Sequence, residues 1–317
     1  MDKQPDGIAI LGECMVELSG PAFGIQQQAF GGDTLNTAIY LSRLLPDLFP
    51  RYVTVLGHDH YSDGMLERWK EEQIDCSMIL RDQHRLPGLY AIEIDKQGER
   101  CFHYWRNESA ARFLCQHEKF TSCLDKLHSI ELLYLSGISI AILPEEDKEI
   151  LILALQSLKA AGVTIAFDSN YRPRLWNNHA HAAMWINRLY QLCDIALVTA
   201  DDESLLLDEP QGSEMIIERL HHLGVSQVII KLGKEGAMWS VLDVGCGLSR
   251  GEQVQNVIDT TAAGDSFNAG FLAARHHKLS VAECCRWGNK VAAEVIQHRG
   301  AIIGRHYIET LTKELKS

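Results

Sequence analysis

Six short apolar runs recur along the chain, and each is bounded by glycine or polar residues. The runs are GIAILGE, RYVTVLG, ELLYLSG, GVTIAFD, CDIALVT and SQVIIKLG. Segments with helical periodicity lie between several of them, such as residues 62–73 and 147–161. In the second segment the spacing predicts one buried apolar stripe: Ile150, Leu153, Ala154 and Leu158. Buried strands that alternate with helices predict an α/β fold with a mostly parallel sheet covered by helices on both faces.

The segment 86–108 breaks this rhythm. Its side chains alternate around the turn DKQG, which predicts a hairpin in a separate small sheet. Since neighbouring side chains of a strand point to opposite faces, one face should carry Phe102, Tyr104 and Arg106. The other face should carry Cys101, His103 and Trp105. An aromatic ring beside a guanidinium suits a lid over a small acid, and an ordinary amphipathic hairpin fits the pattern equally well.

Composition narrows the class of protein. The 317 residues are 46% hydrophobic, and no Pro/Ser-rich stretch or charge block divides them, so one domain over residues 1–317 is expected. The formal net charge of −12 argues against nonspecific nucleic-acid binding, because phosphates would be repelled. We find no signal-peptide pattern, no membrane-spanning run and no metal-ligand spacing among the nine cysteines. A cytoplasmic protein that does not contact membranes is therefore expected.

The segment DTTAAGDSFNAGF, residues 259–271, places small residues and then a carboxylate where a helix should begin. Small side chains let the amides of Ala262, Ala263 and Gly264 approach an anion, and the helix dipole favours negative charge there. Asp265 could then take a proton from a substrate hydroxyl, as carboxylates do in phosphoryl transfer. The same helix terminus should lower the basicity of Asp265. Alone, the pattern also fits a structural helix cap.

A second glycine element, GGDTLNTAIYLSRL, occupies residues 31–44. Together the two segments resemble the signatures of the ribokinase or PfkB family of carbohydrate kinases, a Gly-Gly element followed by Asn and a later D-T-x-G-A-G-D. The resemblance runs from about residue 8 to about residue 305 and implies a ribokinase-like fold, with lid strands inserted at about 13–33 and 86–108. The segments YWRNESAA and FDSNYRPRLW resemble most the branch of the family that acts on a keto-deoxy sugar acid.

The resemblance implies a sugar site beneath the lid. Gly32 and Asn36 match sugar-binding positions, where glycine lets a polyol touch the backbone and asparagine offers a donor and an acceptor. The lid and the acid end of the substrate are assigned to Tyr90, Tyr104, Arg106 and Arg172. One arginine would hold the substrate acid and the other the phosphoryl group, and the sequence leaves open which does which. Arg172 could instead form an ordinary ion pair.

The resemblance also implies a site for ATP and Mg²⁺. The matching positions are Asn170, Lys231, Gly233, Gly236 and Asn289, with the amides of Ala262, Ala263 and Gly264 as an anion hole for the transferring phosphoryl group. Two positions depart from the family pattern: Ala262 replaces a glycine, and Ala200 replaces the asparagine of N-x-x-E. Glu203 matches the glutamate of that motif, which implies a contact with Mg²⁺ through water. Asp201 or Asp202 could compensate for Ala200, and phosphates and water should hold most of the ion.

The resemblance therefore implies an ATP-dependent kinase that phosphorylates the 6-hydroxyl of 2-keto-3-deoxygluconate, with Asp265 as base. A kinase of another sugar, such as fructose, is the alternative, and Tyr104 with Arg106 favours the acid. An inactive sugar-acid or nucleotide sensor is a third interpretation, which an intact Asp265 disfavours. GECMVEL lacks the G-x-G-x-x-G of a Rossmann dehydrogenase. A lid sheet with free edges invites a partner's edge, so we expect a dimer through the lid.

Overall fold

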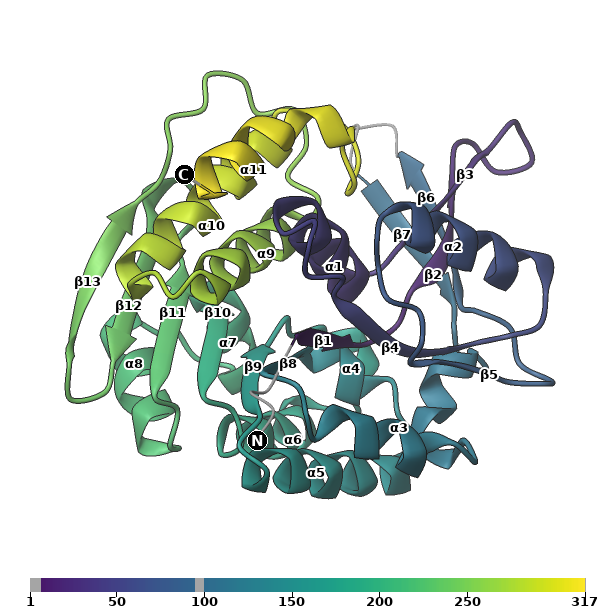
Figure 1. Cartoon of the computed structure of the whole chain (residues 1–317), viewed down its shortest axis with the longest axis horizontal. Coiled ribbons are helices and arrows are strands. Elements are labelled where there is room, and N and C mark those ends of the chain that lie inside the picture. Colours follow the sequence, from purple (N-terminus) through teal and green to yellow (C-terminus); the bar gives the residue numbers. More distant parts are fainter. Residues whose placement is uncertain (1–6, 95–99, 317) are drawn as a thin grey trace.

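A nine-stranded sheet runs through the computed structural model, which describes residues 7–94 and 100–316 (Figure 1). Its strand order is β13-β12-β11-β10-β9-β8-β1-β4-β5. The strands are β1 (Ile8–Leu11), β4 (Arg51–Leu56), β5 (Ile79–Arg81), β8 (Leu132–Ser136), β9 (Thr164–Asp168), β10 (Ile195–Thr199), β11 (Gln227–Lys231), β12 (Gly236–Val241) and β13 (Gly245–Arg250). Pairing is parallel from β5 to β11 and antiparallel for β12 and β13. The six apolar runs form β1, β4, β8, β9, β10 and β11, which confirms the predicted sheet.

Helices cover both faces of this sheet (Figure 1). One layer contains α1 (Asp33–Leu44), α2 (His60–Glu71), α9 (Ala263–His276), α10 (Val281–Val295) and α11 (Glu309–Lys316). The other contains α3 (Phe120–Leu127), α4 (Gly137–Ala141), α5 (Glu145–Ala160), α6 (His179–Tyr190), α7 (Ala200–Leu207) and α8 (Ser213–His222). Short 3₁₀ segments are η1 (Ala110–Gln116), η2 (Pro173–Leu175), η3 (Gly233–Glu235) and η4 (Arg305–Tyr307). In the described ranges, none of the helices has the length and apolar character needed to cross a membrane.

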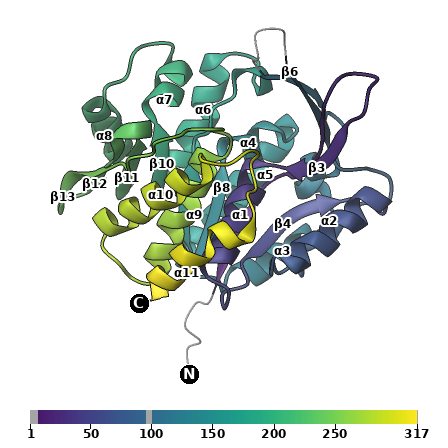
Figure 2. The same ribbon diagram turned by 90° about the horizontal axis from the view of Figure 1, so that it is seen from above.

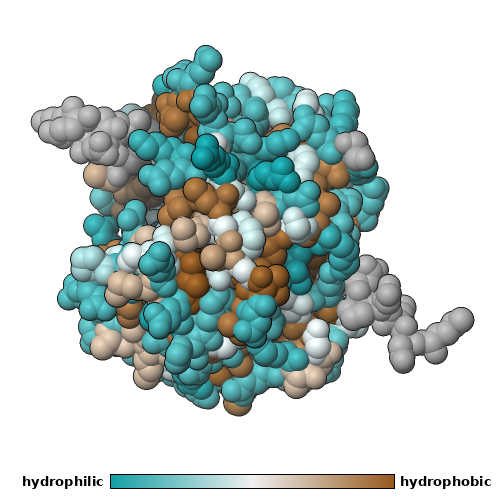
Figure 3. All heavy atoms as spheres, turned by 90° about the vertical axis from the view of Figure 1, so that its left-hand side faces the viewer, coloured by the Kyte–Doolittle hydropathy of each residue, from teal (hydrophilic) through white to brown (hydrophobic). Residues whose placement is uncertain are grey.

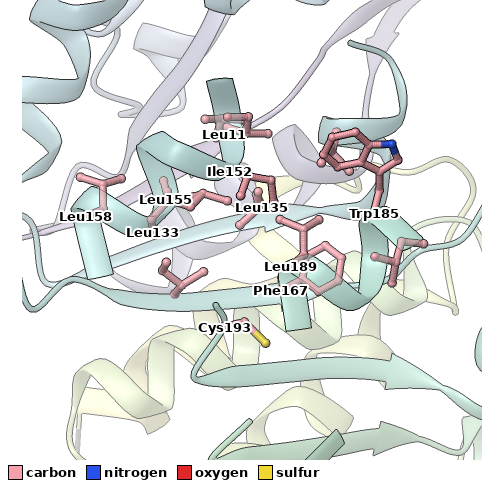
Figure 4. Close-up of a cluster of buried hydrophobic side chains, with 14 of the residues drawn as sticks. Leu11, Leu133, Leu135, Ile152, Leu155, Leu158, Phe167, Trp185, Leu189 and Cys193 are labelled. Carbon is pink, nitrogen blue, oxygen red and sulfur yellow. The ribbon is translucent and has the colours of Figure 1, made fainter. Parts of the chain in front are cut away.

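Two buried apolar clusters join these layers to the sheet. Figure 4 shows part of one, in which side chains of β8 and β9 meet those of α5 and α6. Its labelled members include Leu133, Leu135, Ile152, Leu155, Phe167 and Leu189. Burial of each of these large side chains stabilises the folded state by roughly 1.5–3 kcal/mol relative to leaving it exposed. The clusters hold the strand ends in fixed relative positions, which is what a site at that edge requires.

The predicted apolar stripe of α5 was partly wrong. Ala154 and Leu158 are buried as expected, but Ile150 and Leu153 are 40% and 56% exposed. The residues that join Ala154 and Leu158 against the sheet are Leu151, Ile152 and Leu155. Because α5 carries apolar side chains around much of its circumference, periodicity alone allows two overlapping stripes. The sheet decides which of them is buried.

Four strands form a separate small sheet, which we call the lid: β2 (Met15–Ser19), β3 (Gln27–Gly31), β6 (Leu89–Ile94) and β7 (Arg100–Trp105). Their order is β3-β2-β6-β7, with β2 and β6 parallel. The lid lies at the end of the molecule away from β13 (Figures 1 and 2). The predicted turn at 95–98 lies outside the described residues. The antiparallel pairing of β6 with β7 confirms the predicted hairpin strands.

Candidate active site

The cradle predicted at residues 262–264 lies where α9 begins. Ala262 precedes the helix with φ 61° and ψ 17°, in the left-handed region that glycine adopts more easily. This is the position where the family pattern has glycine, so the chain accepts backbone strain to keep the turn. The amide of Ala263 donates to Thr260 O at 3.2 Å, and that of Ser266 to Ala262 O at 2.9 Å. The predicted anion hole thus coincides with a tight turn into α9.

Asp265 lies in the first turn of α9, where α9 packs against α1. Its Oδ2 accepts a hydrogen bond from Asn36 Nδ2 at 2.8 Å, and its carbonyl accepts one from Thr37 Oγ1 at 3.1 Å. Burial and the negative charge of Asp33 raise the pKa of Asp265 to about 7. The start of a helix and the Asn36 bond both favour the ionised carboxylate, but desolvation and like charge have the larger effect, so the net pKa is raised. A carboxylate with this pKa suits a general base near neutral pH.

Lys231, at the end of β11, brings a positive charge beside the cradle. Its Nζ bonds to Asp168 Oδ2 at 2.6 Å, and a Cβ placed on Gly264 would lie 3.6 Å from it. Asp168 Oδ2 also accepts from Asn268 Nδ2 of α9 at 2.6 Å. Both partners of the ion pair are nearly buried, with side chains 10% and 5% exposed. An ammonium held here could contact an anion bound at the start of α9.

The residues after β9 point toward the same place. Asn170 has φ 31°, and its Nδ2 donates to Asp33 Oδ2 at 2.6 Å. Strained non-glycine backbone of this kind is often found at functional sites. Arg172 is half-exposed, donates to Tyr171 O at 2.9 Å, and lies 3.4 Å from Asp202 Oδ1. Arg172 thus forms the ion pair that the sequence left open as an alternative, and its contact with a ligand stays a prediction.

The aromatic residues predicted for the lid share one face. The ring centroids of Tyr90 and Tyr104 are 5.9 Å apart, and Phe102 stacks on Tyr104 at 6.4 Å. Arg106 Cζ lies 5.9 Å from the centroid of Tyr104. Tyr104 is half-exposed, whereas the hydroxyl of Tyr90 donates to Glu17. The predicted face is thus confirmed, and Tyr104 is its most accessible ring.

Two lid carboxylates escaped the sequence analysis. Glu13 is buried and accepts hydrogen bonds from both Arg106 and Ser109, and Glu17 accepts one from Tyr90. The signal that could have found them is the motif GECMVEL, in which Glu13 lies just before β2 and Glu17 lies within it. They hold the side chains that the sequence assigned to the substrate.

Two buried polar atoms of the predicted sugar site have no hydrogen-bond partner within the described part of the chain. They are Asn36 Oδ1 and Arg106 Nε. One accepts and the other donates, so a ligand with a hydroxyl and an acid group would satisfy both. Unpaired buried polar groups are costly, which favours a ligand at this place.

Gly32 is required by the chain itself. A Cβ on Gly32 would lie 2.2 Å from Glu13 O, so no side chain fits there. The sequence suggested that glycine is needed here so that a polyol can approach the backbone. The structure adds a second reason, because the segment between β1 and β2 also passes close to Gly32. This packing joins the start of α1 to the base of the lid.

On the predicted nucleotide side, the glycines after β11 shape the backbone. Gly233 and Gly236 have φ of 57° and 105°, and a Cβ on Gly236 would lie 2.2 Å from Ser249 O. Asn289 is buried, and its Nδ2 donates to Ser249 O at 3.0 Å and Arg250 O at 3.1 Å. The amide nitrogen of Asn289 thus ties α10 to β13 rather than reaching an open site. Figure 3 looks onto the side of β13 and shows apolar side chains gathered across the middle of that face.

The side chain of Glu203, predicted near Mg²⁺, is enclosed between α6, α7 and α8. It is fully buried on α7, and its carboxylate accepts hydrogen bonds from Tyr190 and Arg219. Burial raises the pKa of Glu203 despite the Arg219 charge. In the parts of the chain that the structure describes, no three His, Cys, Asp or Glu residues form a metal site. The geometry gives Glu203 a structural role, and the prediction of a magnesium contact is corrected accordingly.

A cavity of about 810 Å³ opens between the lid, α2 and residues 299–302. Its lining includes Glu17 and Ala29 of the lid, Arg68 of α2, and Thr261 just before the cradle. Asp265 is not among the lining residues, so this cavity lies beside the base. Thr261, which directly precedes the cradle, is the part of that loop that lines the cavity.

Comparison with known proteins gives these residues a context. A profile described as pfkB family carbohydrate kinase matches residues 6–306. The chain is 46% identical over 310 residues to 2-dehydro-3-deoxygluconokinase from Haemophilus influenzae, covering 97% of this chain and 98% of that protein. It is 43% identical over 304 residues to the protein of the same name from Escherichia coli K12, covering 94% and 97%. A fructokinase with bound ATP from Xylella fastidiosa has a similar fold, with a TM-score of 0.83 at 20% identity and coverage of 99% and 100%.

Proposed function

Because the chain belongs to the pfkB family of carbohydrate kinases, we propose that it transfers the terminal phosphoryl group of ATP to the 6-hydroxyl of 2-keto-3-deoxygluconate. The products are 2-keto-3-deoxy-6-phosphogluconate and ADP. The names of the relatives at 46% and 43% identity support this substrate. The observation that carries the proposal is the position of Asp265, a carboxylate of raised pKa at the start of α9 beside Lys231.

In this mechanism Asp265 accepts the proton of the substrate hydroxyl as the oxygen attacks the terminal phosphorus. The new oxygen–phosphorus bond forms while the bond to the bridging oxygen of ADP breaks, and ADP carries away that electron pair. Asn36 donates to Asp265 Oδ2 and so keeps the carboxylate in one orientation. Since only the ionised form accepts a proton, activity should need a pH near or above 7.

Negative charge on the transferring group is stabilised by positive groups at the cradle. We assign this to the backbone amides of residues 262–264 and to the ammonium of Lys231; the Ala263 amide would exchange its bond to Thr260 O for the phosphoryl oxygen. ATP would lie along the loop that contains Gly233 and Gly236, with its phosphates toward Asn170. Mg²⁺ supplies charge neutralisation when it accompanies ATP. Because the described residues provide no three-ligand site, phosphates and water would hold the ion.

Recognition of the sugar acid falls to the lid and to Asn36. Arg106 Nε has no partner among the described residues and is a donor for the substrate carboxylate, while Tyr90 and Tyr104 cover the sugar. Asn36 Oδ1 would accept from a substrate hydroxyl. Arg172 would contact the transferring phosphoryl group. Fructose is the second candidate, which the fold of the fructokinase allows, although a neutral ketose needs no guanidinium.

The test is ADP release by the purified protein with Mg²⁺ and ATP. Parallel reactions contain 2-keto-3-deoxygluconate, fructose, ribose or no sugar, and each is repeated with Asp265→Asn. Turnover with the keto acid alone, lost in the variant, is the expected result. Turnover with fructose instead would overturn the substrate and the assigned role of Arg106. No turnover with any sugar would favour the sensor interpretation.

A further inference from the structure

Three side-chain hydrogen bonds, connected by short steps along the chain, join α1, α9 and the end of β9. Asp265 accepts from Asn36 of α1 at 2.8 Å, and Asp33, three residues before Asn36, accepts from Asn170 at 2.6 Å. Asp168, two residues before Asn170, accepts from Asn268 of α9 at 2.6 Å. Asn268 lies three residues after Asp265, so the series returns to its start. Asp33 and Asp265 therefore flank one strand end, each held by one asparagine amide.

We infer that Asp33 is a positioning residue for this reaction: its fixed negative charge beside Asp265 keeps that carboxylate a strong enough base to take the proton of the substrate hydroxyl. This inference rests on the proposed function of the same site and goes beyond it in naming the residue that sets the base strength. Asp33 would touch neither the reacting oxygen nor the phosphorus. It acts through Asp265 alone.

The charge of Asp33 is poorly compensated. Asp33 is the first residue of α1, where the helix dipole favours an anion, and its carboxylate is half-buried. Among the described residues, the side chain of Asp33 accepts one hydrogen bond, from the neutral amide of Asn170. Asp168, by contrast, is paired with the Lys231 ammonium at 2.6 Å. Of the two neighbouring carboxylates, Asp33 is therefore the one whose field at Asp265 is least cancelled.

Other groups also face Asp265 and must be counted. Asn36, Thr37 and Tyr40 approach from α1, Tyr134 from β8, Asp168 from β9 and Lys231 from β11. Among these groups, Asn36 and Lys231 favour the ionised form of Asp265, whereas burial, Asp33 and Asp168 oppose it. Removal of the Asp33 charge should consequently make Asp265 easier to ionise and a weaker base.

The experiment measures kcat/KM for 2-keto-3-deoxygluconate from pH 5 to 9 in the wild type and in Asp33→Asn. The wild-type rate should fall below about pH 7, and the variant's midpoint should lie lower by roughly one pH unit. The fraction of plateau activity that remains at pH 6 should then be about fivefold larger in the variant than in the wild type. The plateau itself should fall, because the base is weaker. Asp33→Glu, which keeps the charge, should retain the wild-type midpoint.

Asp125→Asn is the matched control, since it removes one exposed aspartate charge from α3, away from the site. Its pH profile should equal that of the wild type. An Asp33→Asn profile with an unchanged midpoint would overturn the inference and leave Asp33 a merely structural helix residue, even if its rate were low. If the wild type turns over no sugar, the proposed function fails instead. The inference is then decided by a ¹³C NMR titration of the Asp265 carboxyl group, whose signal is assigned with the help of Asp265→Asn. An equal titration midpoint in the wild type and in Asp33→Asn refutes the inference.

Discussion

Glu13 and Arg106 form a buried ion pair at the base of the lid, with side chains 1% and 8% exposed. Ser109 donates to the second oxygen of Glu13, so the carboxylate holds the end of β7 from both sides. One edge of the guanidinium is used in this contact, while Nε remains without a partner in the described part of the chain. The pair therefore fixes the direction in which Arg106 offers its remaining donors.

Variants of Arg106 should show two separate effects, one on KM for the substrate acid and one on the free energy of unfolding. In Arg106→Gln we expect KM for the keto acid to rise roughly 100-fold, about 2.7 kcal/mol, with a smaller effect on kcat. The single variant also leaves Glu13 buried without its cation and should lose about 3 kcal/mol of stability. The double variant Glu13→Gln/Arg106→Gln removes both charges and should recover much of that stability but none of the affinity. Steady-state kinetics and urea unfolding measure the two effects. Equal KM in wild type and double variant would exclude Arg106 from acid binding.

The raised pKa of Asp265 makes a prediction about stability. The folded protein holds the Asp265 proton up to about pH 7, whereas the unfolded chain releases it near pH 3.8. Between these values the folded state binds more protons, so this group lowers the free energy of unfolding as pH rises, by on the order of 2–4 kcal/mol above pH 7. Asp265→Asn stays neutral and should be more stable than the wild type at pH 8, with a gain that disappears toward pH 4. Thermal unfolding of both proteins across this range measures it. A gain of the same size at pH 4 and pH 8 would contradict the ionisation account.

The main sheet could be predicted from the sequence because each buried strand is a local apolar run. Burial of both faces of a parallel strand requires such a run wherever the strand occurs, and β1 and β9 are examples. The buried stripe of α5 could not be predicted in the same way. Its choice between Ile150 and Leu151 depends on how the helix meets the sheet, which is a tertiary property.

In the site, too, features set by a local segment could be predicted, whereas features set by distant residues could not. The cradle and Asp265 lie in one short segment, so small residues before a carboxylate were enough to single them out. Arg106 and Glu13 are 93 residues apart, and Asp33 and Asn170 are 137 apart. No local pattern reports such pairs, and they change the chemistry of the predicted residues. Glu203 is the clearest case: its motif position suggested a metal, and Arg219, 16 residues later, occupies its carboxylate.

Glu203 should therefore contribute to stability and not to metal use. Glu203→Gln leaves the Arg219 guanidinium, 22% exposed, without its anion, and we expect a loss of about 2–3 kcal/mol in the free energy of unfolding. The Mg²⁺ concentration that gives half-maximal rate should stay within twofold of the wild-type value. Chemical unfolding and a Mg²⁺ titration of kinase activity give both numbers. A large rise in the Mg²⁺ requirement of a fully stable variant would restore the original assignment of Glu203 to the metal.

Two apolar side chains next to the lid are exposed in the described structure. Phe23 and Ile25, in the connection between β2 and β3, are 110% and 95% exposed, and β3 is an edge strand of the lid. We propose that a second copy of the chain covers them, since exposed apolar tips and free strand edges favour association. Phe23→Ser/Ile25→Ser should then change a dimer into a monomer in size-exclusion chromatography with light scattering. Val244→Ser, at an 80% exposed apolar position between β12 and β13, is the control and should leave the mass unchanged. A wild-type protein that is monomeric at micromolar concentration, or a double variant that remains dimeric, would remove the lid from the interface.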